Sequence, residues 1–122
     1  MAVCQEFDVE SDIIPNIAAG FGGGIGNTGS VCGAVIGAVM AISLKQERGK
    51  SLEDWLRLAN KVKEFRKRFE DEMGTISCSE LTGYDFSQPA DLEKASNSDI
   101  FQTVCAPAVG LAYHLALDMI KE

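Results

Sequence analysis

Hydrophobic residues recur every three or four positions along most of the chain, which is the spacing of one face of a helix. The longest predicted helix begins at Ser51, a residue type that caps helices, and stops at Gly74, which suits a helix end. The last helix is predicted over about 106–121. The buried stripe of the longest helix is expected to consist of Trp55, Leu56, Ala59, Val62, Phe65 or Arg66, Phe69 and Met73.

A glycine-rich loop precedes an apolar helix that we expect to be central. The loop spans about 20–30, and the helix is predicted over roughly 30–46 with Thr28 or Ser30 as its cap. Gly33, Gly37 and Ala41 fall on one face of that helix, where another backbone can come close.

Shorter helical segments are expected before and after these elements. Residues 1–8 look like the end of a helix that begins upstream, and helical spacing continues over 13–18. Single turns are predicted at 79–81 and 91–95, and no stretch has the alternation of a strand. The pattern predicts one all-α domain over 1–122, a small bundle of about four to five helices with the glycine-rich loop before the central helix.

Charge and composition narrow the classes of partner. The 122 residues carry a net charge of −7, which disfavours binding to nucleic acid or to an anionic membrane surface. The apolar run over 31–44 is shorter than the ~20 residues needed to span a bilayer, and the N-terminal residues lack a signal-peptide pattern. The expectation is a cytoplasmic protein that binds neither membrane nor nucleic acid.

The four cysteines are the clearest candidates for chemistry. No CxxC pair is present, so local zinc-ribbon, thioredoxin and CxxCH haem patterns are absent. Cys32, Cys78 and Cys105 are each expected near a helix start, where partial positive charge stabilises a thiolate and lowers its pKa. Well-spaced cysteines are equally consistent with buried packing, metal ligation or thiol redox chemistry.

Other candidate motifs carry less weight. The glycine loop contains G-x-G-x-x-G from Gly24 to Gly29, but a dinucleotide-binding motif needs a preceding strand, and a helix is predicted there instead. His114, the only histidine, lies in the middle of the last helix, where a structural or exposed role is more common than ligation. The sequence shows no acid–base machinery for a substrate, and whether the protein is an enzyme stays open.

Three segments of the chain resemble one known family. The runs AAGFGGGIG at 18–26 and CGAVIG at 32–37, the segment EMGTISCSELTG at 72–83, and Cys105 before the last helix occur in the order of the C_GCAxxG_C_C family. That family is proposed to be redox-active and is related to a domain of split-Soret cytochrome c. The resemblance implies a small helical protein with an iron–sulfur cluster or another thiolate-bound metal.

The resemblance and the pattern together favour Cys32, Cys78 and Cys105 as metal ligands, with an iron–sulfur cluster preferred and zinc as the alternative. Gly24 and Gly26 would then shield the site and offer amide groups to sulfur. Cys4 is not where the family's first cysteine is expected, so either Cys4 or a partner chain's ligand would complete the site. The shortened first helix leaves apolar surface uncovered, which favours a homodimer. The expected role is electron transfer or redox sensing with a redox protein partner. There are two alternatives. One is a metal-free dithiol protein, and the other is a helical interaction module with structural cysteines.

Overall fold

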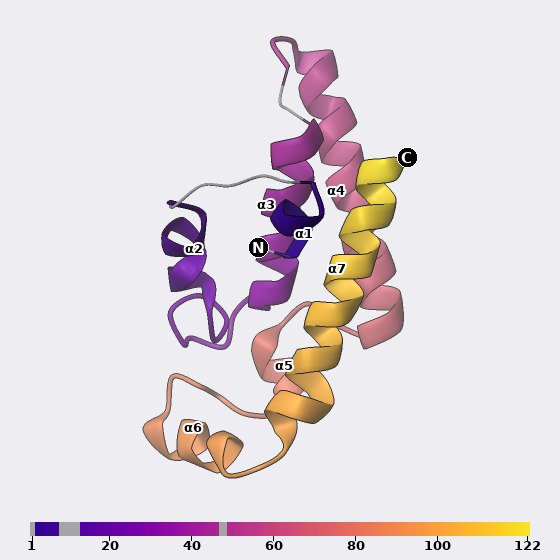
Figure 1. The fold of residues 1–122 in the computed structure, drawn as a ribbon. Coiled ribbons are helices and arrows are strands. Elements are labelled where there is room, and N and C mark those ends of the chain that lie inside the picture. Colours follow the sequence, from indigo (N-terminus) through magenta and orange to yellow (C-terminus); the bar gives the residue numbers. More distant parts are fainter. Residues whose placement is uncertain (1, 8–12, 47–48) are drawn as a thin grey trace.

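The computed structural model describes residues 2–7, 13–46 and 49–122, and this part of the chain is all-α, as predicted. Figure 1 shows the long helices side by side, with the shorter helices at one end and along one flank. In chain order the helices are α1 (Ala2–Glu6), α2 (Ile13–Ala18), α3 (Gly33–Gln46), α4 (Leu52–Met73), α5 (Cys78–Thr82), α6 (Pro89–Ser96) and α7 (Ala106–Lys121). A 3-10 turn, η1 (Ala19–Phe21), follows α2, and a π-helical turn, η2 (Phe101–Cys105), leads directly into α7.

The helix ends agree closely with the sequence signals for α4 and α7. The Ser51 hydroxyl accepts a hydrogen bond from the Asp54 amide at 3.1 Å, so Ser51 is the N-cap of α4. Gly74 ends the helix with a φ of 88°, a left-handed conformation that glycine adopts without cost. The predicted bounds of the last helix coincide with those of α7.

The start of α3 differs from the prediction. The amides of Val35 and Ile36 donate to the carbonyl of Cys32, so the helix begins immediately after that cysteine. The hydroxyl of Thr28 donates to carbonyls within the glycine loop and does not cap the helix. Local loop geometry therefore overrides the capping preference of Thr28 and Ser30.

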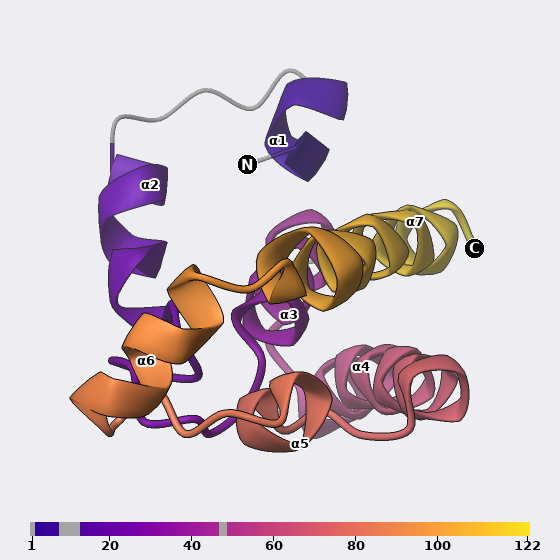
Figure 2. The same ribbon diagram turned by 90° about the horizontal axis from the view of Figure 1, so that it is seen from below.

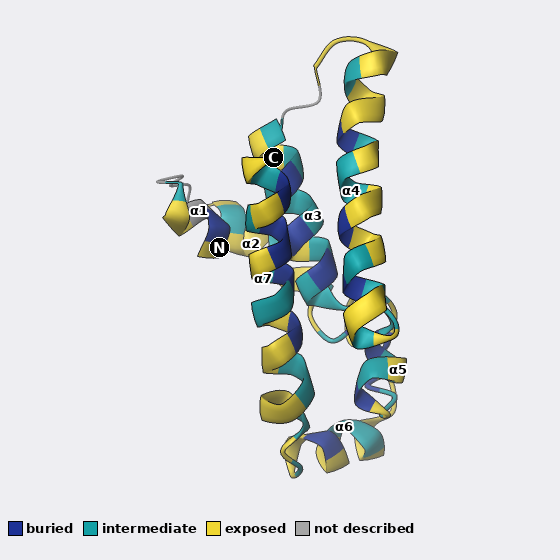
Figure 3. Cartoon of the chain, turned by 90° about the vertical axis from the view of Figure 1, so that its right-hand side faces the viewer, coloured by how far each residue is buried: buried dark blue, intermediate teal, exposed yellow. Residues whose placement is uncertain are grey.

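The main core lies between α3, α4 and α7, which Figure 2 shows packed around a common axis. The first helix, α1, lies on α7 and contributes Val3 to this core. Apolar side chains from each long helix point inward, and these faces are the dark stripes in Figure 3. The most deeply buried of them are Ile42, Phe65, Phe69, Ala108, Ala116 and Met119.

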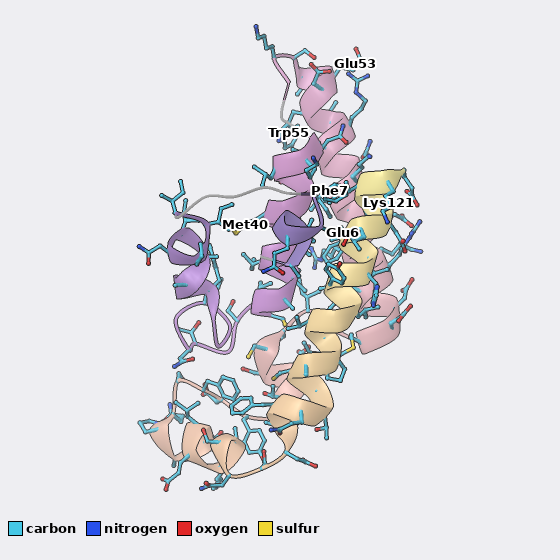
Figure 4. The ribbon with its side chains drawn as sticks, in the orientation of Figure 1. Glu6, Phe7, Met40, Glu53, Trp55 and Lys121 are labelled. Carbon is cyan, nitrogen blue, oxygen red and sulfur yellow. The ribbon has the colours of Figure 1, made fainter. Side chains whose placement is uncertain are left out.

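The buried stripe of α4 was predicted correctly in its second half and wrongly at its start. Phe65 and Phe69 are fully buried, whereas Trp55 is 50% exposed and Leu56 is 46% exposed. The reason is length: α4 has 22 residues and extends beyond the ends of its shorter neighbours α3 and α7, so its first turns have little to pack against (Figures 1 and 4). Helical spacing shows that a face is apolar, but it does not show where the covering helices end.

A smaller second core lies under the lower end of the bundle. It consists of Cys78, Phe86 and Ala95, with Tyr84, Leu92 and Ile100 packed around them. These residues come from α5, α6 and the loop between them, except Ile100, which lies between α6 and η2. The cysteine of α5 therefore belongs to the small core, whereas Cys32 packs against the main one.

Together, η2 and α7 form one continuous helix, Phe101–Lys121. By length and composition alone, this helix could cross a bilayer. In the structure one face of the longer helix forms part of the main core through Ala108, Ala112 and Ala116.

Candidate thiol site

Two of the three candidate cysteines are held in place by a single antiparallel bridge between Val31 and Ser77. The Cys32 amide donates to the Ile76 carbonyl at 2.8 Å, and the Cys78 amide donates to the Ser30 carbonyl at 2.6 Å. Residues on either side of such a pair point to the same face, so the two cysteine side chains leave the bridge on one side. Diagonal neighbours of this kind have Cα atoms about 7–8 Å apart.

The third cysteine reaches the site through the π-helical turn η2. The Ala106 amide donates to the Phe101 carbonyl, five residues back, instead of the usual four. Pro107 explains the widened turn, because a proline has no amide to donate and its ring crowds the carbonyl four residues before it. Cys105 is the last residue of the π turn, and η2 contacts α5, the helix that Cys78 begins.

The three thiols share one electrostatic environment. Burial raises the pKa of Cys78 to about 11, and the nearby thiols of Cys32 and Cys105 add to the shift. Burial also raises the pKa of Cys105, with a further contribution from Cys32. Each thiol is therefore close enough to the other two for their charges to interact, which the sequence alone could not establish.

The expectation that helix starts would lower the cysteine pKa values is wrong for two of the three. Cys78 opens a helix of only five residues, whose macrodipole is small, and the side chain is buried in the small core. Cys105 is preceded by helical residues, so it does not face an open helix N-terminus. Desolvation outweighs the dipole at both positions, and both thiols favour the protonated form.

This raised pKa predicts an alkaline loss of stability in the metal-free chain. A thiol whose pKa rises on folding stabilises the protein fully below its unfolded value, here about 9.0, and the contribution is lost as the pH rises through about 11. Urea unfolding of the wild type and of Cys78→Ser across this range is expected to show a difference in unfolding free energy that falls with pH, because serine does not titrate. A difference that stays constant would contradict the assignment.

The glycine loop folds as a left-handed turn that packs behind Cys78. Five successive residues, 23–27, have φ values between 59° and 74°, and three of them are glycines. The Gly26 amide donates to the Gly20 carbonyl at 2.8 Å, and the Ser30 amide donates to the Gly24 carbonyl at 2.9 Å. These two amides are used within the loop, so the Gly26 amide is not offered to a sulfur atom. The part expected of the Gly24 amide stays a prediction.

Gly24 and Gly26 occupy different environments. Gly24 is buried, and a Cβ built on it would lie 2.7 Å from the Cβ of Cys78. Gly26 is exposed, and a Cβ there would meet nothing within 4 Å. Gly24 thus lets the loop backbone approach the site, as expected, whereas Gly26 is required only by the left-handed conformation of the turn.

Ile25 is a strained residue in the same turn. It has a φ of 65°, which is unfavourable for a β-branched residue, and its side chain is 40% exposed. We expect Ile25→Gly to raise the free energy of unfolding by about 1 kcal/mol, since the left-handed conformation costs an L-residue about 1–2 kcal/mol. Chemical unfolding measures the change, and Ile25→Ala is the control, because it keeps the Cβ atom and should bring no comparable gain.

A serine that the sequence analysis did not assign to the site fixes the loop to α5. The Ser79 hydroxyl donates to the Gly29 carbonyl at 2.8 Å, and the Ser79 amide donates to the same carbonyl at 3.1 Å. The only sequence signal was its position next to Cys78. This contact keeps the glycine loop against the cysteine and makes Ser79 a supporting residue of the site.

Cys4 and His114 are the remaining candidates for the site. The side chain of Cys4 lies outside the described residues, and its part in the site stays a prediction. His114 is exposed on α7, with its ring 5.4 Å from that of Tyr113. Across the described ranges, no three His, Cys, Asp or Glu side chains are grouped so that they could hold a metal ion. Cys32, Cys78 and Cys105 are free thiols.

The order and spacing of these cysteines match a known family along almost the entire chain. The sequence model described as "Putative redox-active protein (C_GCAxxG_C_C)" matches residues 1–119. The chain belongs to this family. The C_GCAxxG_C_C assignment confirms the resemblance seen in the sequence and supports a redox role at the coarse level at which the family is described. No curated protein and no solved structure shows significant similarity to the chain.

Proposed function

We propose that Cys32, Cys78 and Cys105 form a thiolate site that binds an iron–sulfur cluster and serves electron transfer or redox sensing. The observation that supports it most is the mutual influence of three free thiols from three separate segments of the chain. The bridge between Val31 and Ser77 directs two of them to the same side. A redox protein in the cytoplasm would be the electron partner.

The donor set suits such a cluster chemically. Thiolates are the usual ligands of iron–sulfur clusters, and they also bind zinc, so the family resemblance is what favours iron. Bound, the cluster would supply one-electron chemistry, and the chain would supply the three sulfur ligands and the shielding by Gly24. Because the described side chains are not grouped as a finished metal site, binding requires their segments to close around the ligand.

The two alternatives fit the geometry less well. A disulfide needs Cα atoms within about 7 Å, and diagonal neighbours across an antiparallel pair typically have Cα atoms about 7–8 Å apart. Simple packing would account for buried Cys78, but Cys32 and Cys105 are only half-buried.

The first test is the iron, zinc and acid-labile sulfide content of protein purified without oxygen, together with its visible spectrum. Brown protein with iron and sulfide in similar amounts is the expected result. Zinc alone would make the site structural. Protein that stays colourless and metal-free after anaerobic reconstitution would overturn the proposal, and a count of reactive thiols would then distinguish dithiol chemistry from packing.

A further inference from the structure

An apolar groove with a basic rim lies between α3 and α4. We call it the Trp55 groove, and its volume is about 410 Å³. Ser43 of α3 lines it together with residues of α4 that share one helix face at three- to four-residue spacing. The α4 residues are Trp55, Leu58, Ala59, Val62, Lys63 and Arg66.

Trp55 leaves a large apolar surface open to solvent at this groove. It is 50% exposed (Figure 4), and the nearby Leu52 and Leu56 of the same helix are 71% and 46% exposed. The apolar surface therefore continues past the groove along α4. Tryptophan and arginine are among the residue types most enriched at binding hot spots, and a protein segment that docks on a helix contacts several of its turns.

The charges at the Trp55 groove are positive, although the chain as a whole is acidic. Of the described residues that line the groove only Lys63 and Arg66 are charged, whereas the chain has a net charge of −7. Arg66 is paired with Glu70 at 2.7 Å. Lys63 is exposed and forms no ion pair or hydrogen bond with any described residue. The groove thus presents one cation that its described neighbours leave unneutralised.

The sequence around Lys63 accounts for this missing partner. On a helix the neighbours of a side chain lie three and four residues away, and for Lys63 these are Ala59, Asn60, Arg66 and Lys67. None of the four is acidic and two are cations, so positive charge accumulates at this place. A carboxylate supplied from outside the chain would relieve the repulsion and complete an ion pair beside an apolar groove.

We propose that the Trp55 groove binds an apolar, acidic segment of another protein. An apolar side chain of that segment would occupy the groove next to Trp55, and an Asp or Glu carboxylate would pair with Lys63. Elsewhere the net negative charge of the chain repels an acidic partner, which restricts its binding to this position. The apolar contact supplies most of the affinity, and the exposed ion pair fixes the orientation.

The Trp55 groove is separate from the thiol site. Trp55 lies in the first turn of α4, whereas Cys78 follows the opposite end of that helix (Figure 1). A segment bound in the groove would not need to contact the cysteines. The proposal therefore does not depend on what the thiols bind, and its test is independent of the proposed function.

The test uses Trp55 itself as the reporter, because it is the only tryptophan in the chain. Peptides selected from a random display library against the whole chain would be titrated while the tryptophan emission is recorded. The same titration would be made with Lys63→Glu and with Lys67→Glu. Lys67 is the matched control, because it is an exposed lysine one turn further along α4, is paired with Asp71 and does not line the groove. Circular dichroism would check that each variant remains helical.

We expect the selected peptides to combine apolar residues with Asp or Glu and to shift the Trp55 emission to shorter wavelength in a saturable way. Lys63→Glu should raise their dissociation constant at least about tenfold (about 1.4 kcal/mol), and Lys67→Glu should change it much less. Enrichment of basic peptides, or of none, would overturn the proposal. Equal effects of the two substitutions, or binding that leaves the emission unchanged, would overturn it as well. An emission shift with protein concentration alone would assign the groove to a second copy of the chain and contradict it too.

Discussion

Gly24→Ala is expected to destabilise the chain by about 3 kcal/mol or more and to disturb the thiol site. The φ of 74° at this position already costs an alanine about 1–2 kcal/mol. The new Cβ would also lie 2.5 Å from the Ser30 amide nitrogen and 2.7 Å from the Cβ of Cys78, so backbone and site must both shift. Overpacking of this kind typically adds about 1–3 kcal/mol.

Gly26→Ala is the matched control for this substitution. Its φ of 61° is similar, but its Cβ would point into open space, so only the conformational cost of about 1 kcal/mol remains. Urea unfolding of both variants gives the two free-energy changes. Equal losses would show that the close approach of the loop to Cys78 is not what constrains Gly24.

Cys78→Ser is expected to abolish binding of the proposed cluster, as measured by iron content and visible absorbance after anaerobic reconstitution. Serine has nearly the same size as cysteine, but its ligand atom is a hard oxygen. Iron–sulfur clusters and zinc both prefer a soft thiolate. Cys78 is buried in the small core, with Gly24 of the glycine loop against it. Cys32→Ser is expected to have the same effect.

Two controls make this prediction specific. Cys4→Ser tests whether the fourth cysteine is a ligand. If Cys4 is a ligand, this variant loses its colour as Cys78→Ser does, and if it is not, the colour remains. Ser79→Ala should weaken the attachment of the glycine loop while leaving all thiols in place, so partial retention of iron is expected. Full colour in Cys78→Ser would contradict the proposed ligand set.

The sequence predicted those parts of the fold that depend on local chemistry. The cap at Ser51, the left-handed Gly74 and the bounds of α7 follow from residue preferences over a few positions, and all three are correct. The exposure of Trp55 was not predictable, because it depends on how far α3 and α7 extend beside α4. Likewise, the different environments of Gly24 and Gly26 depend on contacts with α5, which is distant in the sequence.

For the candidate site, too, the sequence indicated which residues take part but not their surroundings. The family pattern identified Cys32, Cys78 and Cys105, and the structure places the three thiols within reach of one another's charge. The pKa direction was wrong because helix position is visible in a sequence, whereas burial in a second core is not. The contact of Ser79 with Gly29 depends on the bridge between Val31 and Ser77, and a single bridge between two loop segments leaves no periodic signal.

The interior is divided into two cores, and the candidate cysteines are distributed between them. Cys78 is part of the small core, and Cys32 packs against the large one, so a site that includes both cysteines spans the two cores. A ligand held by all three sulfurs would link the two cores and stabilise them against separation.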